Sequence, residues 1–305
     1  MSRRLPSPCP NTSPTRRRLL QCLSGAPLLA LTLAPTARGS SPARVVCVGG
    51  ALTETVYALG AQAQLVGVDT TSNFPTAARQ LPSVGYARQL SSEGLLALAP
   101  TRVLATEDAG PPAVLRQLEQ AGVPLTVLPA NKRFEGVVQR VQRMGELLGR
   151  REAAQALAQQ LSTQWQATRA RVAGRSAPAP RVLFVMSHGP SQMMVSGRAT
   201  SADAVLAYAG ARNVVQGFEG YKPLTPEALI AAQPDVLLLT EQGYQAMGGH
   251  DGALQLPGLA QTPAGRHGRV LAMETMYLLG FGPRLPAAVA ELDARLHSAM
   301  QGQRP

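Results

Sequence analysis

The sequence predicts an α/β fold in which two Rossmann-like lobes are joined by a single long linking helix. Short apolar runs typical of strands alternate with helical runs in both halves of the chain. Between the halves, residues 134–174 contain no proline and repeat alanine, glutamine, arginine and leucine at helical spacing. A seventeen-residue segment also occurs twice, once in each half. We therefore expect an N-terminal lobe over 44–133, a linking helical segment over 134–174 and a C-terminal lobe over 175–305, after an export signal and short linker at 1–43.

The length of 305 residues suits two domains of ordinary size better than one core. Glycine and proline separate the expected elements of the first lobe, and the second lobe begins with a strand over 181–186. Within the linking segment, Gly149 marks a candidate break. The expected strands of the first lobe are 45–48, 65–68, 102–105 and 125–127, and its expected helices are 53–59, 93–98 and 112–121.

The net charge of +11 is concentrated at the start of the chain. Residues 1–43 hold six arginines and no acidic residue, so 11 minus 6 leaves +5 for the rest of the chain. That remainder shows no lysine-rich stripe, and only 4% of the whole chain is aromatic. Nucleic-acid binding needs basic and aromatic clusters, so we expect no nucleic-acid partner.

The first 43 residues have the order of an export signal: an arginine-rich start, an apolar stretch over 19–33 and small residues over 34–43. We expect cleavage between about residues 34 and 43 and residence in the periplasm. The run Thr-Arg-Arg-Arg-Leu-Leu at 15–20 resembles the twin-arginine consensus. An ordinary Sec leader rich in arginine remains the alternative.

Cysteine usage predicts a mature chain without an internal disulfide. Cys9 and Cys22 lie in the leader, which leaves Cys47 alone. Because Cys47 lies inside the apolar run 45–48, we expect it to be a buried structural thiol.

The internal repeat aligns residues 90–106 with 224–240, and seven of the seventeen positions are identical. In each copy a Ser or Thr precedes a short helix, and a carboxylate, Glu93 or Glu227, lies in its first turn. Stabilisation of the helix start is one explanation of these acids. A two-point electrostatic docking surface, with one acid on each lobe, is the other.

A Gly-Tyr pair precedes each copy of the repeat, with Tyr86 in the first lobe and Tyr221 in the second. The symmetry predicts that both tyrosines lie in corresponding loops that face a cleft.

Four stretches carry a resemblance to a known family: SVGYARQLSSEGLLAL, LFVMSHG, GYKPLTPEALIAAQPDVLL and LLGFGPRLP. Over residues 44–300 the chain resembles the periplasmic hemin-binding proteins of bacterial heme ABC importers. These belong to the cobalamin- and siderophore-binding class that is built on one rigid linking helix. The resemblance implies capture of ferric heme b between the lobes and its delivery to an inner-membrane ABC permease with its ATPase. We expect the binding protein to be a monomer.

The resemblance implies that Tyr86 is the axial ligand of the ferric iron. Ferric iron is hard, and a phenolate oxygen is a hard anionic donor known in heme ligation. The free tyrosine side chain has a pKa of ~10, so the site must favour the phenolate. Arg88 has two candidate roles, stabilising that phenolate or pairing with a heme propionate.

Three further residues are cleft candidates. His188 matches a histidine that in some members of the family binds a second heme, so it is a candidate second ligand or cleft contact. Tyr221 and Lys222 lie in the GYKPL motif, and a lysine suits the propionates of heme.

The catalytic motifs of serine hydrolases, P-loop proteins, zinc peptidases and dinucleotide-binding enzymes do not occur in the sequence. We therefore expect a binding protein with no catalytic residue. An exported hydrolase that uses His188 is the alternative of another class. Within the binders, cobalamin and a ferric siderophore are the rival ligands. The linking helix predicts only modest rocking of the lobes.

Overall fold

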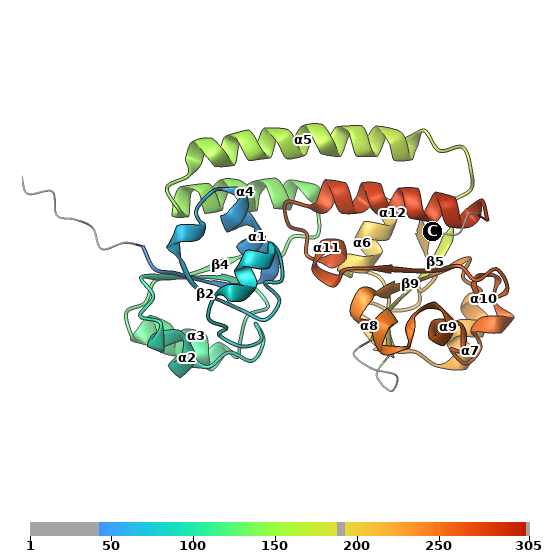
Figure 1. Ribbon diagram of the computed structural model, residues 1–305, viewed down its shortest axis with the longest axis horizontal. Helices are drawn as coiled ribbons and strands as arrows, with labels where there is room; N and C mark the ends of the chain where they lie inside the picture. The colour runs from blue at the N-terminus through green and yellow to red at the C-terminus, as the bar shows by residue number, and fades with distance from the viewer. Residues whose placement is uncertain (1–42, 188–192, 303–305) are drawn as a thin grey trace, which may run out of the picture. The chain divides into compact units, whose positions relative to one another are not determined.

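The computed structural model describes residues 43–187 and 193–302 (Figure 1). The export signal predicted at 1–43 therefore lies almost wholly outside the described residues. The first lobe is built on a four-stranded parallel sheet with the order β2-β1-β3-β4. Its strands are β1 (Val45–Val48), β2 (Leu65–Val68), β3 (Arg102–Thr106) and β4 (Leu125–Leu128), and its helices are α1 (Gly50–Ala58), α2 (Ser92–Ala97) and α3 (Pro112–Gln120), with short 3-10 turns at Gln62–Gln64 and Thr76–Gln80. This agrees with the expected elements to within a few residues at each end.

The second lobe is built on a mixed sheet with the order β10-β9-β5-β6-β8. Strands β5, β9 and β10 are parallel, whereas β6 and β8 run antiparallel at one edge. The strands are β5 (Arg181–Ser187), β6 (Met193–Ser196), β7 (Arg212–Asn213), β8 (Tyr221–Pro223), β9 (Val236–Thr240) and β10 (Val270–Met273). The helices are α6 (Ser201–Tyr208), α7 (Pro226–Ala232), α8 (Glu241–Ala246), α9 (Gly249–Leu254), α10 (Pro263–Arg266), α11 (Thr275–Leu279) and α12 (Leu285–Met300), with a 3-10 turn at Leu259–Gln261.

The linking segment consists of two helices, α4 (Phe134–Leu147) and α5 (Arg151–Ala173). They meet at Gly149, whose φ of +67° is a conformation that favours glycine, as the sequence indicated. Helix α5 packs against α4 on one lobe and α12 on the other, so the connection between the lobes runs through α5 (Figure 1). None of the described helices is both long and apolar enough to cross a membrane.

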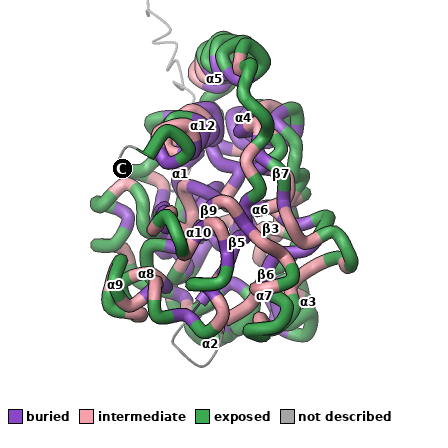
Figure 2. The backbone as a smooth tube through the Cα atoms, turned by 90° about the vertical axis from the view of Figure 1, so that its right-hand side faces the viewer, coloured by how far each residue is buried: buried purple, intermediate pink, exposed green. Residues whose placement is uncertain are grey.

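Three apolar clusters hold the structure together, and one of them is common to both lobes. Alternate residues of a strand point to opposite faces of its sheet. Val45 and Cys47 therefore face α1 and α4, whereas Val46 and Val48 face α2 and α3. The first pair belongs to a cluster that continues under α4 and α5 into the second lobe, where it includes Phe184 of β5 and much of α12. Figure 2 shows these buried residues beneath α5, whose outward side is exposed.

A buried ion pair crosses from one lobe to the other. Glu54 of α1 accepts hydrogen bonds from the guanidinium of Arg284, which precedes α12, with a distance of 2.9 Å from Nε to Oε2. The side chain of Glu54 is 5% exposed and that of Arg284 is 24% exposed. The guanidinium also lies over the rings of Phe74, at 4.0 Å, and Tyr277, at 4.8 Å. Arg284 therefore joins the first lobe to the α11–α12 connection.

Aromatic packing reinforces this junction at the start of α4. Trp165 of α5 stacks on Phe134 at 4.8 Å and meets the ring of Tyr208, from α6, edge-on at 4.7 Å. Arg140 of α4 donates hydrogen bonds to the carbonyl oxygens of Pro129 and Phe281, which lie in different lobes. The lobes are thus held by side chains as well as by the linking helix.

We predict that Arg284→Met destabilises the fold by about 3 kcal/mol, because the Glu54 carboxylate then stays buried without its partner. The free energy of unfolding in urea measures the loss. Arg143→Met is the matched control, since the Arg143–Glu146 pair lies on one helix with side chains 55% and 46% exposed. Exposed pairs contribute about 0.2–1 kcal/mol. Equal losses in the two variants would contradict the assigned role of Arg284.

Cys47 is completely buried in β1, as the sequence predicted. Burial raises the pKa of its thiol to about 12; the charge of Asp69 adds to the rise and a hydrogen bond with Thr53 opposes it. The thiolate is the reactive form of cysteine, so the native protein keeps this thiol inert.

We expect iodoacetamide to leave Cys47 unmodified in the native protein at mildly alkaline pH and to modify it fully in urea. Mass spectrometry of the peptide that contains Cys47 measures this residue apart from Cys9 and Cys22. Rapid modification under native conditions would show that β1 opens more readily than its burial implies.

Candidate functional site

The strand order of the first lobe places a candidate ligand-binding edge at the carboxyl ends of β1 and β3. The chain passes from β1 to β2 on one side and then to β3 on the other, so the connections diverge between β1 and β3. Ligands of open α/β sheets bind at such a point, beyond the carboxyl ends of the strands. The segment 69–91, which follows β2, and the turn 107–111, which follows β3, both begin at this edge.

The segment after β2 is anchored by Asp69, which is buried. Its carboxylate accepts hydrogen bonds from the backbone amides of Gly49, at 2.9 Å, and Thr71, at 3.0 Å. It also accepts from the hydroxyls of Thr71, at 2.7 Å, and Ser72, at 2.9 Å. These bonds fix the start of the segment that carries the candidate iron ligand.

Tyr86 lies in this segment with its side chain turned away from the core. It is 42% exposed, whereas its neighbours Val84 and Ala87 are buried. Its carbonyl oxygen accepts from the amide of Gln89 at 2.8 Å, and Gly85 before it has a φ of +90°. The buried neighbours therefore hold the turn while the phenol faces solvent, as a ligand-binding side chain requires.

Arg88 forms an ion pair with Asp108, at the end of β3. Both Nε and Nη2 of the guanidinium donate to the same carboxylate oxygen, at 3.0 and 2.8 Å. The bond to Asp108 is the main cause that raises the pKa of Arg88, and the charges of Tyr86 and Tyr221 add to it. Partial burial tends to raise the pKa of Asp108, but hydrogen bonds with Thr106 and Arg88 lower it below its ordinary value.

Tyr221, in the second lobe, is close enough to Arg88 for the charge of the guanidinium to act on its phenol. Its pKa is raised by burial, against the opposing effects of a hydrogen bond with Thr200 and the charge of Arg88. The sequence placed this tyrosine in a loop equivalent to that of Tyr86, and this expectation was wrong. Tyr221 is the first residue of β8, which pairs with β6. The two sites thus differ in local structure, because β6 and β8 have no counterpart in the first lobe.

Lys222 follows Tyr221 in β8, and consecutive residues of a strand point to opposite faces. Tyr221 is half-buried, whereas Lys222 is exposed and its ammonium lies 4.7 Å from the centre of the Phe218 ring. Electrostatic effects therefore link Arg88 to Tyr86 and Tyr221, whereas Lys222 contacts Phe218 instead. His188 lies outside the described residues.

Glu93 and Glu227 occupy equivalent positions in the two lobes. The hydroxyl of Ser91 caps α2 by accepting from the amide of Gly94, and Thr225 caps α7 in the same way. Both glutamates are exposed in the first helical turn, and among the described residues neither forms an ion pair. In Figure 1, α2 and α7 lie at the ends of the lobes remote from α5.

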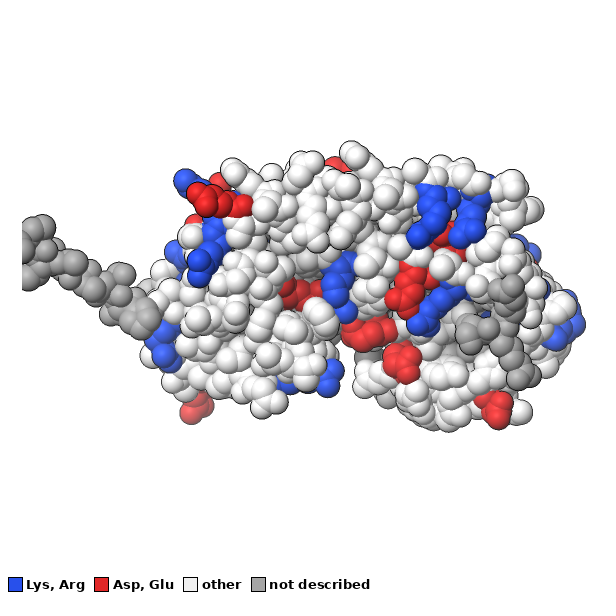
Figure 3. Space-filling model, turned by 45° about the horizontal axis from the view of Figure 1, so that its top comes forward, with Lys and Arg blue, Asp and Glu red and all other residues white. Residues whose placement is uncertain are grey.

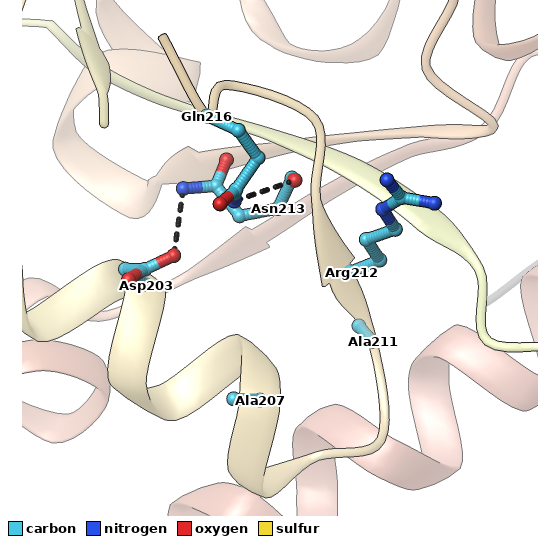
Figure 4. A pocket seen from close by; sticks show the side chains of 6 residues that line it. All are labelled: Asp203, Ala207, Ala211, Arg212, Asn213 and Gln216. Atoms are coloured by element: carbon cyan, nitrogen blue, oxygen red, sulfur yellow. Dashed lines mark hydrogen bonds between the residues drawn. The ribbon is translucent and has the colours of Figure 1, made fainter. Parts of the chain in front are cut away.

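A cavity of about 250 Å³ in the second lobe contains none of the predicted site residues (Figure 4). Three of its polar side chains take part in hydrogen bonds or brace the turn within the protein. Asn213 donates to Asp203 at 3.0 Å, and Gln216 donates to the Asn213 carbonyl oxygen at 3.1 Å. These bonds brace the turn after β7. The cavity is lined by Asp203, Ala207, Ala211, Arg212, Asn213 and Gln216.

Metal-binding groups give no competing site in the described part of the chain. Figure 3 shows basic and acidic side chains interspersed on one face, where a notch separates the two lobes. Across residues 43–187 and 193–302, no group of three or more His, Cys, Asp or Glu side chains is placed to hold a metal ion.

Asp108 is the site residue that the sequence analysis missed. A single acid after a strand has no motif or spacing that distinguishes it from an ordinary turn residue. Its position at the carboxyl end of β3, directly before Ala109 and Gly110, was the available signal.

The chain is similar to periplasmic binding proteins in both sequence and structure. Residues 45–276 match a family model described as periplasmic binding protein. The chain is similar to a solved structure of the periplasmic heme-binding protein BhuT in complex with two hemes, with 48% sequence identity, a TM-score of 0.81 and coverage of 84% of this chain and 98% of that one. It is also similar to the periplasmic heme-binding protein RhuT from Roseiflexus sp. RS-1 in apo form, with 40% identity, a TM-score of 0.82 and coverage of 85% and 99%. A cobalamin-binding protein of Halobacterium salinarum is 27% identical over 266 residues, which are 85% of this chain and 70% of that protein.

Proposed function

Because the chain belongs to the family of periplasmic binding proteins, we propose that it captures ferric heme b in the periplasm, between its two lobes, and delivers it to an inner-membrane ABC permease. The observation that carries this proposal is the exposed Tyr86 two residues before Arg88, which is paired with Asp108 at the carboxyl edge of the first sheet. The charge of Arg88 also acts on Tyr221 of the second lobe. A phenolate suits ferric iron, and a guanidinium suits an anionic oxygen next to it. The similarity to two heme-binding proteins at 48% and 40% identity supports the same ligand.

Cobalamin is the second candidate ligand, because a cobalamin-binding protein shares 27% identity with the chain. The binding of cobalamin gives no reason for a phenol and a guanidinium at one edge, whereas the iron and the carboxylates of heme use both. Competition between hemin and cyanocobalamin for the protein separates the two ligands. A binding protein releases its ligand chemically unchanged, whereas an exported hydrolase would convert it. Analysis of the ligand recovered after incubation with the protein separates these two alternatives.

We predict that Tyr86→Phe removes the charge-transfer band of the ferric phenolate complex and weakens hemin binding at least about tenfold. The variant keeps the ring and loses only the oxygen that binds iron. A titration of the full chain with hemin, followed by its Soret and charge-transfer bands, measures both effects.

Tyr57→Phe is the matched control for this titration. Tyr57 lies near the end of α1, which runs back from the binding edge, so its loss leaves the spectrum unchanged. An unchanged spectrum in Tyr86→Phe would exclude Tyr86 as the ligand. The endpoint of the titration counts the hemes, and we propose His188 as the second ligand or a cleft contact on its sequence motif alone.

We propose that Glu93 and Glu227 contact basic groups of the permease. Each lobe has one exposed glutamate that forms no ion pair with any described residue, on a helix at the end remote from α5, so the two acids together would set both the position and the orientation of the docked protein. Opposite charges across an interface mainly guide association. Delivery then depends on both lobes being held at once.

Reversing both charges, in Glu93→Lys/Glu227→Lys, is expected to reduce heme uptake by cells at least about tenfold while hemin affinity stays unchanged. Glu146→Lys/Glu152→Lys makes the same change in net charge at exposed sites on α4 and α5, remote from α2 and α7, and should leave uptake intact. Normal uptake by the Glu93/Glu227 variant would rule out this docking surface.

A further inference from the structure

Asp108 connects the strand β3 to the segment that carries the proposed iron ligand. The segments are tied by backbone hydrogen bonds from the Gly110 amide to Ala87 and from the Leu90 amide to Gly110, both at 2.8 Å. The Asp108 carboxylate adds the ion pair with Arg88. The turn that carries Asp108 is closed onto the last residue of β3 by a hydrogen bond from the Ala109 amide to the Thr106 carbonyl oxygen, at 2.9 Å. The ion pair with Asp108 therefore fixes the position of the Arg88 guanidinium relative to the sheet.

The atoms that Arg88 uses in this ion pair define what it can offer a ligand. Nε and Nη2 donate to one oxygen of Asp108, which occupies one edge of the planar guanidinium. Within the described residues, Nη1 donates no hydrogen bond to the protein. The described residues thus leave the edge formed by Nη1 and Nη2 unused, and it is the edge that matches a carboxylate or a paired oxygen.

The ion pair also changes the electrostatic contribution of Arg88. A carboxylate at 2.8 Å offsets most of the field that the guanidinium would otherwise produce at a distance. Near the ion pair, Arg88 then acts mainly through its N–H groups, which donate hydrogen bonds in a fixed direction. Removing Asp108 should weaken heme binding if Arg88 acts as a positioned hydrogen-bond donor. It should strengthen heme binding if Arg88 acts through its net positive charge, so the two roles can be tested.

We propose that Asp108 is a positioning residue of the heme site, which holds the Arg88 guanidinium beside Tyr86 so that its Nη1–Nη2 edge binds an anionic oxygen of the bound heme complex. The inference rests on the proposed function. Asp108 itself touches Arg88 rather than the ligand. Free rotation of a long arginine side chain in a partly exposed site would otherwise oppose ligand binding.

Two substitutions of the same residue test the proposal in the full chain, with hemin as the probe. Asp108→Ala removes the acceptor and the charge, and we expect its Kd for hemin to rise about tenfold with a shifted Soret band. Asp108→Asn keeps an oxygen that can accept from Nε and Nη2, and we expect it to restore most of the affinity and the wild-type spectrum. If Asp108 only offset the charge of Arg88, both variants would bind hemin more tightly.

Repeating the Asp108 substitution in a variant that lacks Arg88 tests whether Asp108 acts through Arg88. In Arg88→Gln, the further change Asp108→Ala should have no effect on the Kd, because the group that Asp108 positions is already absent. The thermal midpoint of each protein without heme checks that the fold is intact. Glu146→Ala, whose side chain is 46% exposed against 44% for Asp108, controls for the change in net charge.

The possible failures are distinct. If the wild-type chain does not bind hemin, the proposed function is wrong. If the wild type binds hemin and Asp108→Ala binds it equally well, only the role of Asp108 is overturned. A loss of affinity that persists in the Arg88→Gln background would equally overturn it, because the effect would then not pass through Arg88.

Discussion

One apolar core continues from the first lobe through α4 and α5 into the second, and the geometry of the binding edge depends on it. A core shared by two lobes opposes their separation, since pulling them apart would expose apolar surface to water. The buried Glu54–Arg284 pair and the aromatic stack at Trp165 lie at the same junction. Tyr86 and Tyr221 belong to different lobes, so a site that uses both, as proposed, depends on a fixed junction.

The polar side chains near the candidate binding edge have different roles. Asp69 is buried and satisfies backbone and hydroxyl donors, so it builds the segment rather than the site. Tyr86 is exposed on that segment and is available to a ligand. Arg88 combines both roles: Nε and Nη2 of its guanidinium bind Asp108, and no described residue accepts a hydrogen bond from Nη1. The arrangement explains how a tyrosine on an irregular segment acquires a defined position.

The sequence predicted the strands of the first lobe, a linking helical segment with a candidate break at Gly149, and the tyrosine segment, because each has a local periodicity or motif. It predicted one linking helix where the structure has two, α4 and α5. It did not predict the pairing of β6 with β8, since strands of three or four residues depend on their partners rather than on pattern. Tyr221 was assigned to a loop for that reason. The Glu54–Arg284 pair joins residues 230 positions apart, and Asp108 is a lone acid, so neither leaves a local signal.

The shared core also has a kinetic consequence. When the lobes are already held near their final separation, a ligand enters a preformed notch, and no slow closure has to precede or follow the encounter. The association rate then depends on diffusion and orientation, and differences between ligands are expressed in their residence times. In the proposed function, rapid release would then be imposed from outside, by a permease that contacts both lobes and strains the junction between them.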